Sequence, residues 1–312
     1  MAWFFVVLGL VTLLLAGDLL VRAAVNLALR LGISALVVSL TVVAFGTSAP
    51  ELLIVLSAMA DDAPGLAMGN IVGSNTANIL LVLGLPALAA GLYTTGFDTK
   101  KAFISMILAT VLFITLAFVG PFSWWHGGLM LAVLAAILLD QAWTVRRVSR
   151  VAVATEDLNG VDTAIPGWKI TLYLLFGLVG LPLGAKVLVV NAEIIAREFG
   201  VPETAIGLTL IAVGTSLPEL ATTTVAAIRR QADVALGNVI GSNMFNLLAI
   251  IGIAALVGPI PVADEFLRFD LWVMLAASFL LIPFVFFGRN ITRIWGVALT
   301  LLYMAYLLAV LL

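Results

Sequence analysis

The sequence predicts an all-α membrane protein with ten transmembrane helices, arranged as two inverted five-helix repeats with kinked helices at the middle of the bilayer. Three observations support this fold class. Hydrophobic residues make up 63% of the 312 residues and charged residues only 10%, whereas a soluble domain carries about 25% charged residues. Apolar runs of transmembrane length recur along the chain, and two polar blocks inside them occur twice.

The apolar runs divide the chain into ten predicted spans, each near the roughly 20 residues that cross a bilayer. They cover residues 2–29, 34–58, 65–91, 102–120, 126–145, 168–197, 203–228, 233–257, 270–288 and 293–312. The one long polar stretch, 146–166, begins with basic residues and contains acidic residues and turn formers, which is typical of a loop. We therefore expect a first repeat over residues 1–145, a cytoplasmic linker over 146–167 and a second repeat over 168–312.

Two polar blocks recur at one fixed distance along the chain. Gly-Thr-Ser-x-Pro-Glu occupies residues 46–51 and again 214–219, and Gly-Asn-x-x-Gly-Ser-Asn occupies 69–75 and 237–243. Asn78 and Asn246 extend the second block, and every matched pair lies 168 positions apart. Apolar helices that resemble one another by chance would not align polar residues in this way. The blocks therefore predict homologous halves, with the matched residues on the second and third span of each.

Five spans in each half require the second half to be inverted, and the charges agree. The loop after the second span carries Asp61 and Asp62, whereas the matching loop of the second half carries Arg229 and Arg230. Opposite charge at equivalent positions is expected of inverted halves, because cytoplasmic loops are enriched in Lys and Arg.

The remaining cations set the expected orientation of the chain, with both termini outside and the central linker in the cytoplasm. With the N-terminus outside, eleven cations fall at cytoplasmic positions and two fall outside, which obeys the positive-inside rule. The eleven are Arg30, Lys100, Lys101, Arg146, Arg147, Arg150, Lys169, Arg229, Arg230, Arg289 and Arg293, and the two are Arg197 and Arg268. Arg22 and Lys186 lie within spans and are left out of the count.

A glutamate lies inside the second span of each half. A charged side chain at the centre of a bilayer costs about 2.5–3.5 kcal/mol on insertion scales, so Glu51 needs a partner or a water-filled cavity. Its own block contains no Lys or Arg. A protonated glutamate that only bonds one helix to another is the structural alternative, but the identical, inverted Glu219 favours a binding site.

The spacing around each glutamate favours one binding face. Thr47 and Ser48 precede Glu51 by four and three residues, so the three side chains share one face of a helix. Pro50 lacks an N–H group and clashes with the preceding turn, so we expect a kink that leaves carbonyl oxygens around residues 44–47 without their usual partners. Such carbonyls need another partner in a bilayer, and a cation would supply it. The second half repeats the arrangement at Ala212, Gly214, Thr215, Ser216, Pro218 and Glu219.

The second block adds Ser74 and Asn78, four residues apart on one helical face, and Ser242 and Asn246 mirror them. Its glycines are explained at least in part as small residues that let helices pack closely. The other asparagines, at 70, 75, 238 and 243, are interpreted as caps or braces. The donors are all oxygens, without thiol or imidazole, and such a set selects hard cations. Calcium takes 6–8 oxygens, two carboxylates balance its charge, and the same oxygens suit sodium.

These blocks resemble the signature of the cation/calcium exchanger superfamily, most closely its prokaryotic sodium/calcium exchanger branch. The signature is a pair of inverted repeats carrying G-T-S-x-P-E and G-N-x-x-G-S-N-x-x-N/D, and the ten-helix layout covers the whole chain. The resemblance implies a monomeric antiporter in the cell membrane that exchanges Ca²⁺ for Na⁺, three sodium ions for one calcium ion, without a cofactor. It also implies that the first and sixth spans slide as a gate, and Gly17 and Pro182 are expected to interrupt them.

The resemblance further implies four central ion sites, with Glu51 and Glu219 as shared ligands and Ala44 and Ala212 contributing backbone carbonyls. The implied ligand set is Ala44, Thr47, Ser48, Glu51, Ser74, Asn78, Ala212, Thr215, Ser216, Glu219, Ser242 and Asn246. Some relatives, including potassium-dependent ones, carry Asp at the position of Asn246, so its amide weakens the case for potassium co-transport.

The sequence is compatible with several alternative functions. A proton/calcium antiporter of the same fold is the closest, although that branch carries a different second block. A hydrolase is disfavoured because Ser48 has no histidine nearby and His126 is the only histidine in the chain. A channel is disfavoured because channels usually form their path from oligomeric rings, whereas inverted repeats with interrupted helices are typical of transporters. The net charge of −2 gives no basic surface for nucleic acid.

Overall fold

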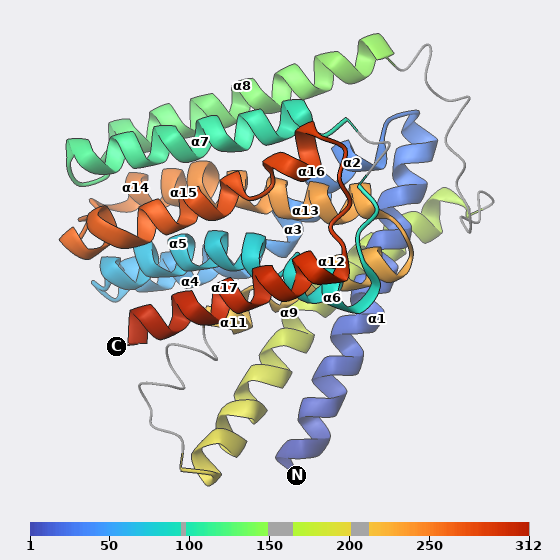
Figure 1. The fold of residues 1–312 in the computed structure, drawn as a ribbon, viewed down its shortest axis with the longest axis horizontal. Coiled ribbons are helices and arrows are strands. Elements are labelled where there is room, and N and C mark those ends of the chain that lie inside the picture. Colours follow the sequence, from blue (N-terminus) through green and yellow to red (C-terminus); the bar gives the residue numbers. More distant parts are fainter. Residues whose placement is uncertain (95–97, 149–164, 201–211, 312) are drawn as a thin grey trace.

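A computed structural model describes residues 1–94, 98–148, 165–200 and 212–311 as an assembly of helices without strands (Figure 1). Nine spans in the described ranges are long and apolar enough to cross a membrane. The seventh predicted span, 203–228, falls partly on residues 201–211, which lie outside the described residues, as does most of the predicted linker. Its described part is short and apolar. The all-helical membrane fold with two inverted five-helix repeats is therefore confirmed.

The first half contains spans of two kinds, continuous and broken. Its helices are α1 (Ala2–Leu31), α2 (Ala35–Val38), the π-helix η1 (Ser39–Val43), α3 (Ala44–Thr47), α4 (Ala49–Ala60), α5 (Pro64–Leu80), α6 (Gly84–Ala90), α7 (Lys100–Val119) and α8 (Trp124–Val148). The second span is thus built from α2, η1, α3 and α4, and the third from α5 and α6. The first, fourth and fifth spans are each one helix.

The second half follows the same plan. Its helices are α9 (Gly167–Glu198), α11 (Ala212–Thr215), α12 (Leu217–Ile228), α13 (Ala232–Met244), the π-helix η3 (Phe245–Ile250), α14 (Ile251–Val257), the π-helix η4 (Phe266–Asp270), α15 (Leu271–Phe279), α16 (Ile282–Phe286) and α17 (Arg293–Leu311). The expected interruptions at Gly17 and Pro182 are wrong, because α1 and α9 continue through them. α9 packs closely against α1 near Pro182, and this packing helps to keep the helix continuous there.

The backbone itself repeats where the second span turns into the third. α4 and α12 end in the same kind of turn, in which Asp62 has a φ of 54° and Arg230 a φ of 58°. These are the only residues other than glycine with positive φ in the described parts of the chain. An L-residue pays a steric cost in this conformation, so its occurrence at two matched positions supports a common origin for the halves. Asp61 and Arg229 therefore occupy equivalent places.

The helices α1 and α9 pack against each other and cross the other helices obliquely. Figure 1 shows the N-terminal end of α1 and the C-terminal end of α9 standing apart from the bundle. Glycines permit the close approach: a Cβ atom at Gly184 would lie 2.9 Å from the backbone nitrogen of Leu13, and one at Gly9 2.7 Å from that of Leu188. Small residues at helix interfaces are the usual means of close packing in membranes.

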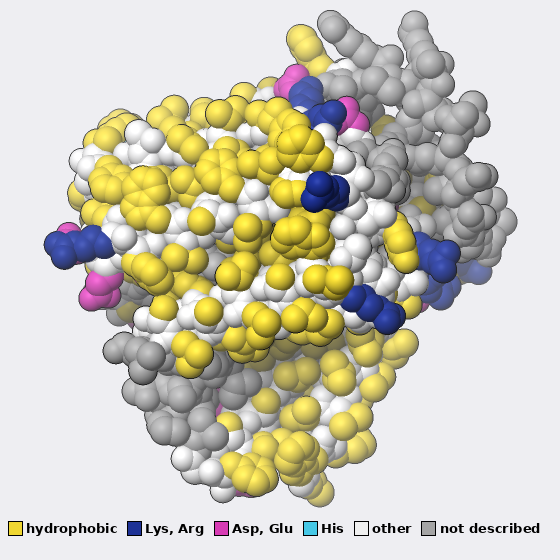
Figure 2. Space-filling view, viewed as in Figure 1, with side chains coloured by type: hydrophobic (Ala, Val, Ile, Leu, Met, Phe, Trp, Pro, Cys, Tyr) yellow, Lys and Arg dark blue, Asp and Glu magenta, His cyan; other side chains and the backbone are white. Residues whose placement is uncertain are grey.

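The surface of the bundle is apolar where lipid would cover it. Figure 2 shows hydrophobic side chains over most of the face in view, with Lys and Arg side chains mainly toward its right-hand edge. The most buried spans are the third and the eighth, formed by α5–α6 and by α13, η3 and α14. These two spans carry the second polar block of each half, so the polar residues of both blocks lie at the centre of the molecule.

Candidate ion-binding site

The helix that carries each glutamate breaks immediately before it. Ser48 (φ −83°, ψ 3°) separates α3 from α4, and Ser216 (φ −85°, ψ 4°) separates α11 from α12. The following proline lies in the first turn of the new helix, where its missing N–H costs no hydrogen bond. Glu51 and Glu219 consequently occupy the first turns of α4 and α12. The expected kink is confirmed, and each carboxylate lies at the positive end of a helix dipole.

The carbonyl of Ala44 differs from the expectation. It accepts a hydrogen bond from the backbone N–H of Ser48 at 3.0 Å, so the break does not free it. The reason is geometric: Pro50 removes the N–H that would reach the carbonyl four residues earlier, at Gly46. The Thr47 hydroxyl also lies within hydrogen-bond distance of this carbonyl, at 3.3 Å, so the role of Ala44 as a carbonyl ligand stays a prediction. Ala212 begins α11, and its role as a carbonyl ligand stays a prediction.

Side chains from the two halves meet directly. The hydroxyl of Ser48 donates to Oε1 of Glu219 at 3.4 Å, and Ser242 donates to the same oxygen at 3.4 Å. The Thr47 hydroxyl lies 3.3 Å from that of Ser242. On the other side, the hydroxyls of Ser74 and Thr215 lie 3.3 Å apart. The two glutamates are close enough to interact electrostatically. The structure therefore gathers the predicted hydroxyl and carboxyl residues of both halves in one place.

The amides of the second block cross between α5 and the α13–η3 span. Asn78 donates its Nδ2 to Oδ1 of Asn243 at 3.0 Å, and Asn246 donates its Nδ2 to Oδ1 of Asn75 at 3.0 Å. The sequence predicted Asn75 and Asn243 only as caps or braces and assigned them no partners. Their place in the repeated block was the only signal that they were involved.

Asn238 is a further residue whose contacts the sequence did not predict. Its Oδ1 accepts a hydrogen bond from the Thr47 hydroxyl at 3.2 Å, and its Nδ2 lies 3.3 Å from the Thr223 hydroxyl. It thus links the predicted ligand segment of the first half to α12 of the second.

The site is buried and rich in oxygen atoms that have no hydrogen-bond partner in the protein. Glu51 and Glu219 are both 0% exposed. Six oxygens on residues of the predicted set are buried and unpartnered: both carboxylate oxygens of Glu51, Oε2 of Glu219, Oδ1 of Asn78, Oδ1 of Asn246 and Oγ of Ser216. An unpaired buried polar group is costly, and carboxylates without partners are more so. Bound cations would supply partners for oxygens of this kind.

The donor set consists of hard oxygen ligands, of which only the two carboxylates carry charge. Among the described residues, no group of three or more His, Cys, Asp or Glu side chains lies together, so the site supplies two carboxylates and otherwise uncharged oxygens. Such a set suits calcium or sodium better than a transition metal. His126 lies in the first turn of α8, outside the two polar blocks, where its Nδ1 accepts a hydrogen bond from the Ser123 backbone N–H at 3.1 Å and lies 3.0 Å from the Ser123 hydroxyl.

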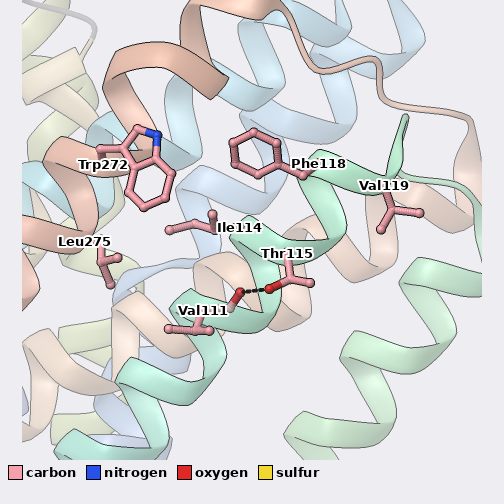
Figure 3. Close-up of a pocket in the computed structure, with 7 residues that line it drawn as sticks. All are labelled: Val111, Ile114, Thr115, Phe118, Val119, Trp272 and Leu275. Carbon is pink, nitrogen blue, oxygen red and sulfur yellow. Dashed lines mark hydrogen bonds between the residues drawn. The ribbon is translucent and has the colours of Figure 1, made fainter.

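A separate cavity lies between α7 and α15 and has a different character. It has a volume of about 450 Å³ and is lined by apolar side chains, with Trp272, Phe118 and Leu275 among them (Figure 3). The hydroxyl of Thr115 faces its own helix and donates to the Val111 carbonyl at 2.8 Å. Its lining contains no carboxylate or amide side chain, in contrast to the site around the two glutamates.

Comparison with known proteins gives consistent relatives along the whole chain. A family model described as sodium/calcium exchanger protein matches residues 1–143 and 169–312. The sodium/calcium exchanger MaX1 of Methanosarcina acetivorans is 34% identical over 334 residues, covering 96% of this chain and 95% of that protein. The inner membrane protein YrbG of Escherichia coli is 34% identical over 277 residues, covering 87% and 85%. A solved structure of the sodium–calcium exchanger NCX_Mj, soaked with Na⁺ and Ca²⁺, has a TM-score of 0.81 at 30% identity and covers 97% of this chain and 96% of that one.

The fold and the buried oxygen-lined site define a membrane transporter built from two inverted repeats. The family model accounts for both repeats and leaves out only the segment between them. The chain belongs to the sodium/calcium exchanger protein family, which confirms the resemblance found in the two polar blocks.

Proposed function

We propose that this chain is an antiporter that exchanges Ca²⁺ for Na⁺ by alternating access, three sodium ions for one calcium ion. The single observation that carries the proposal is the group of six buried, unpartnered oxygens around Glu51 and Glu219. The names of the relatives, MaX1 and NCX_Mj, support the same pair of ions.

The charge of the site explains why the two ions exclude each other. Two ionised carboxylates are neutralised by one Ca²⁺ ion. Calcium also accepts an irregular set of oxygens, such as the one that the two polar blocks of each half supply. Sodium ions can occupy the same oxygens, but three of them leave one net positive charge. Each ion therefore leaves when the other replaces its charge, and every cycle with this stoichiometry moves one charge across the membrane.

The remaining residues of the predicted set act around the two glutamates in this proposal. Ser48 and Ser242 hold Glu219. The hydroxyl groups of Thr47, Ser74, Thr215 and Ser216 line the pocket. The backbone carbonyls of Ala44 and Ala212 complete the sodium sites among the four central ion sites. The chain acts as a monomer in the cell membrane, with both termini outside, the central linker in the cytoplasm, and no cofactor. In this orientation the loop that carries Asp61 lies outside. A cysteine introduced at Asp61 should therefore react with an impermeant maleimide that is added outside.

The purified protein in sealed liposomes tests the proposal. Liposomes loaded with Na⁺ and diluted into Na⁺-free buffer containing calcium-45 are expected to accumulate calcium, since outward sodium flux drives the exchange. Liposomes loaded with choline instead of Na⁺ should not. A potassium diffusion potential should change the uptake rate, because each cycle moves net charge.

Other outcomes would identify another coupling. Calcium uptake driven by a pH gradient alone, without Na⁺, would replace sodium coupling by proton coupling. Uptake that needs K⁺ together with Na⁺ would indicate a potassium-dependent exchanger. Discrete single-channel currents in planar bilayers would contradict antiport altogether.

A further inference from the structure

We propose that Asn75 and Asn243 are positioning residues that aim the amide oxygens of Asn78 and Asn246 into the ion pocket; the proposal rests on the proposed function of that pocket. The four side chains are each no more than 1% exposed. They form two crossed pairs: Asn246 donates to the side-chain oxygen of Asn75, and Asn78 donates to that of Asn243, both at 3.0 Å.

Asn75 and Asn243, the inner asparagines, use both the nitrogen and the oxygen of their side-chain amides in hydrogen bonds. Nδ2 of Asn75 donates to the main-chain carbonyl of Asn243 at 3.2 Å, and Nδ2 of Asn243 donates to that of Asn75 at 3.3 Å. Each inner asparagine is therefore fixed on the opposite helix and holds its acceptor oxygen in a defined place. Because the side-chain oxygen of each inner asparagine already accepts a hydrogen bond from Asn246 or Asn78, we infer that it orients that residue and does not bind the ion.

These hydrogen bonds fix the orientation of the outer pair, Asn78 and Asn246. An asparagine amide carries two N–H donors on one side and an oxygen acceptor on the other. Because the N–H groups of Asn78 and Asn246 are held by Asn243 and Asn75, their oxygens point away, and both oxygens are buried without a partner. Without these hydrogen bonds, the side-chain amide of Asn78 or Asn246 could rotate by about 180° and turn its N–H groups toward the ion, which they would repel.

A thermodynamic cycle on calcium binding tests this arrangement. In purified protein titrated with Ca²⁺ at fixed Na⁺, Asn246→Ala and Asn75→Ala are each expected to weaken calcium binding about tenfold, as usual for residues that orient metal ligands. If Asn75 acts through Asn246, the double variant should bind no more weakly than the weaker single variant. The inverted pair, Asn243 and Asn78, should behave in the same way and stands in if the first pair fails to fold.

Thr76→Val is the matched control, because Thr76 is a buried polar residue next to Asn75 whose hydroxyl bonds only to the Val72 carbonyl of its own helix. It should bind calcium like the parent. If Asn246→Ala leaves calcium binding unchanged, Asn246 is not a ligand and the positioning role of Asn75 is overturned, whereas the glutamate variants test the pocket itself. If Asn246→Ala weakens binding while Asn75→Ala does not, or if the two losses add, the pocket stands and the positioning role is overturned.

A second inference comes from an independent observation on α1. Asp18 lies in the middle of that helix and forms an ion pair with Arg229 at the end of α12 and another with Arg22, 2.8 Å away on its own helix. The matching positions of the second half are Lys186 on α9 and Asp61 at the end of α4, so both charges are reversed. Among the described residues, Lys186 and Asp61 form no ion pair with each other or with another side chain.

The packing of the helices shows the same asymmetry. α1 packs along α12, and a Cβ atom at Gly17 would lie 3.3 Å from the backbone of Ala221. The equivalent pair, α9 and α4, has no comparable packing in the described residues. We infer that the two charge-reversed pairs are alternating latches, one on each side of the membrane. The pair Asp18–Arg229 is closed in this conformation, and Lys186–Asp61 closes in the opposite one as α1 and α9 move against the bundle.

The chain has no cysteine, so introduced cysteines give a clean test. In the variant Asp61→Cys with Lys186→Cys, the rate of crosslinking by an impermeant bifunctional maleimide reports how often these two positions approach each other. The two substitutions remove the charges of this pair, so the rate depends on the state of the Asp18–Arg229 pair alone. Asp18→Asn, or Arg229→Gln, should raise that rate about two- to fivefold, since a partly exposed ion pair contributes up to about 1 kcal/mol. The exchanged pair Asp18→Lys with Arg229→Asp should return the rate to that of the parent.

Asp264→Asn is the matched control, because Asp264 forms an ion pair with Arg268 that is exposed and far along the chain from both latches. It should leave the crosslinking rate unchanged. An unchanged rate in Asp18→Asn, a charge exchange that fails to restore the parent, or cysteines that never crosslink would each overturn the alternating latches. None of these outcomes depends on which ions are carried.

Discussion

Glu51→Gln and Glu219→Gln are each expected to abolish calcium exchange and weaken calcium binding about a hundredfold or more. Each substitution removes half of the negative charge in a buried site while keeping the shape of the side chain. Removing one partner of a buried ionic contact costs about 3–5 kcal/mol, and about 1.4 kcal/mol corresponds to a factor of ten in affinity. Calorimetric titration of the purified variants with Ca²⁺ and calcium-45 flux in liposomes measure both effects.

Asp270→Asn is the control for this prediction. Asp270 is another carboxylate within a membrane-spanning segment, and it accepts a hydrogen bond from Tyr306 at 3.0 Å away from both polar blocks. The variant should bind calcium like the parent. Calcium binding that survives in either glutamate variant, in protein that remains monodisperse, would remove the pocket from the mechanism.

The two glutamates lie in the same Gly-Thr-Ser-x-Pro-Glu motif, but their contacts in the structure differ. Oε1 of Glu219 accepts hydrogen bonds from Ser48 and Ser242, whereas neither oxygen of Glu51 has a partner in the protein. Glu51 is thus the less constrained ligand of the two. The repeated blocks could not predict this difference, because it arises from the conformation of the whole molecule and not from the local chain.

The features of the structure that the sequence predicted depend on residues close together in the chain. The breaks at Ser48 and Ser216 follow from the proline two residues later, and the inversion follows from an odd number of spans together with the charges of Asp61 and Arg229. What could not be predicted depends on which faces of distant helices meet. The contact of Asn238 with Thr47, and the crossing of Asn75 to Asn246, join residues more than 160 positions apart.

Gly241→Ala is expected to lower both the stability of the protein and its affinity for calcium. Gly241 lies where α13 crosses η1 and α3, and an added Cβ atom would lie 2.6 Å from the Leu40 carbonyl oxygen and 2.6 Å from Cβ of Ala44. Backbone atoms cannot turn aside, so the two segments must separate. Overpacking of this kind costs about 1–3 kcal/mol, against a gain of up to about 1 kcal/mol from replacing glycine in a helix.

The separation would act on the pocket because Ser242, the next residue, lies against Thr47 and Glu219. Gly128→Ala is the matched control: Gly128 is exposed on α8, and an added Cβ atom there meets nothing within 4 Å. It should leave calcium affinity unchanged and keep or slightly raise the midpoint of thermal unfolding. Thermal unfolding and calcium titration of both variants distinguish the two sites, and equal behaviour of the two would show that the α13–η1 crossing does not set the geometry of the pocket.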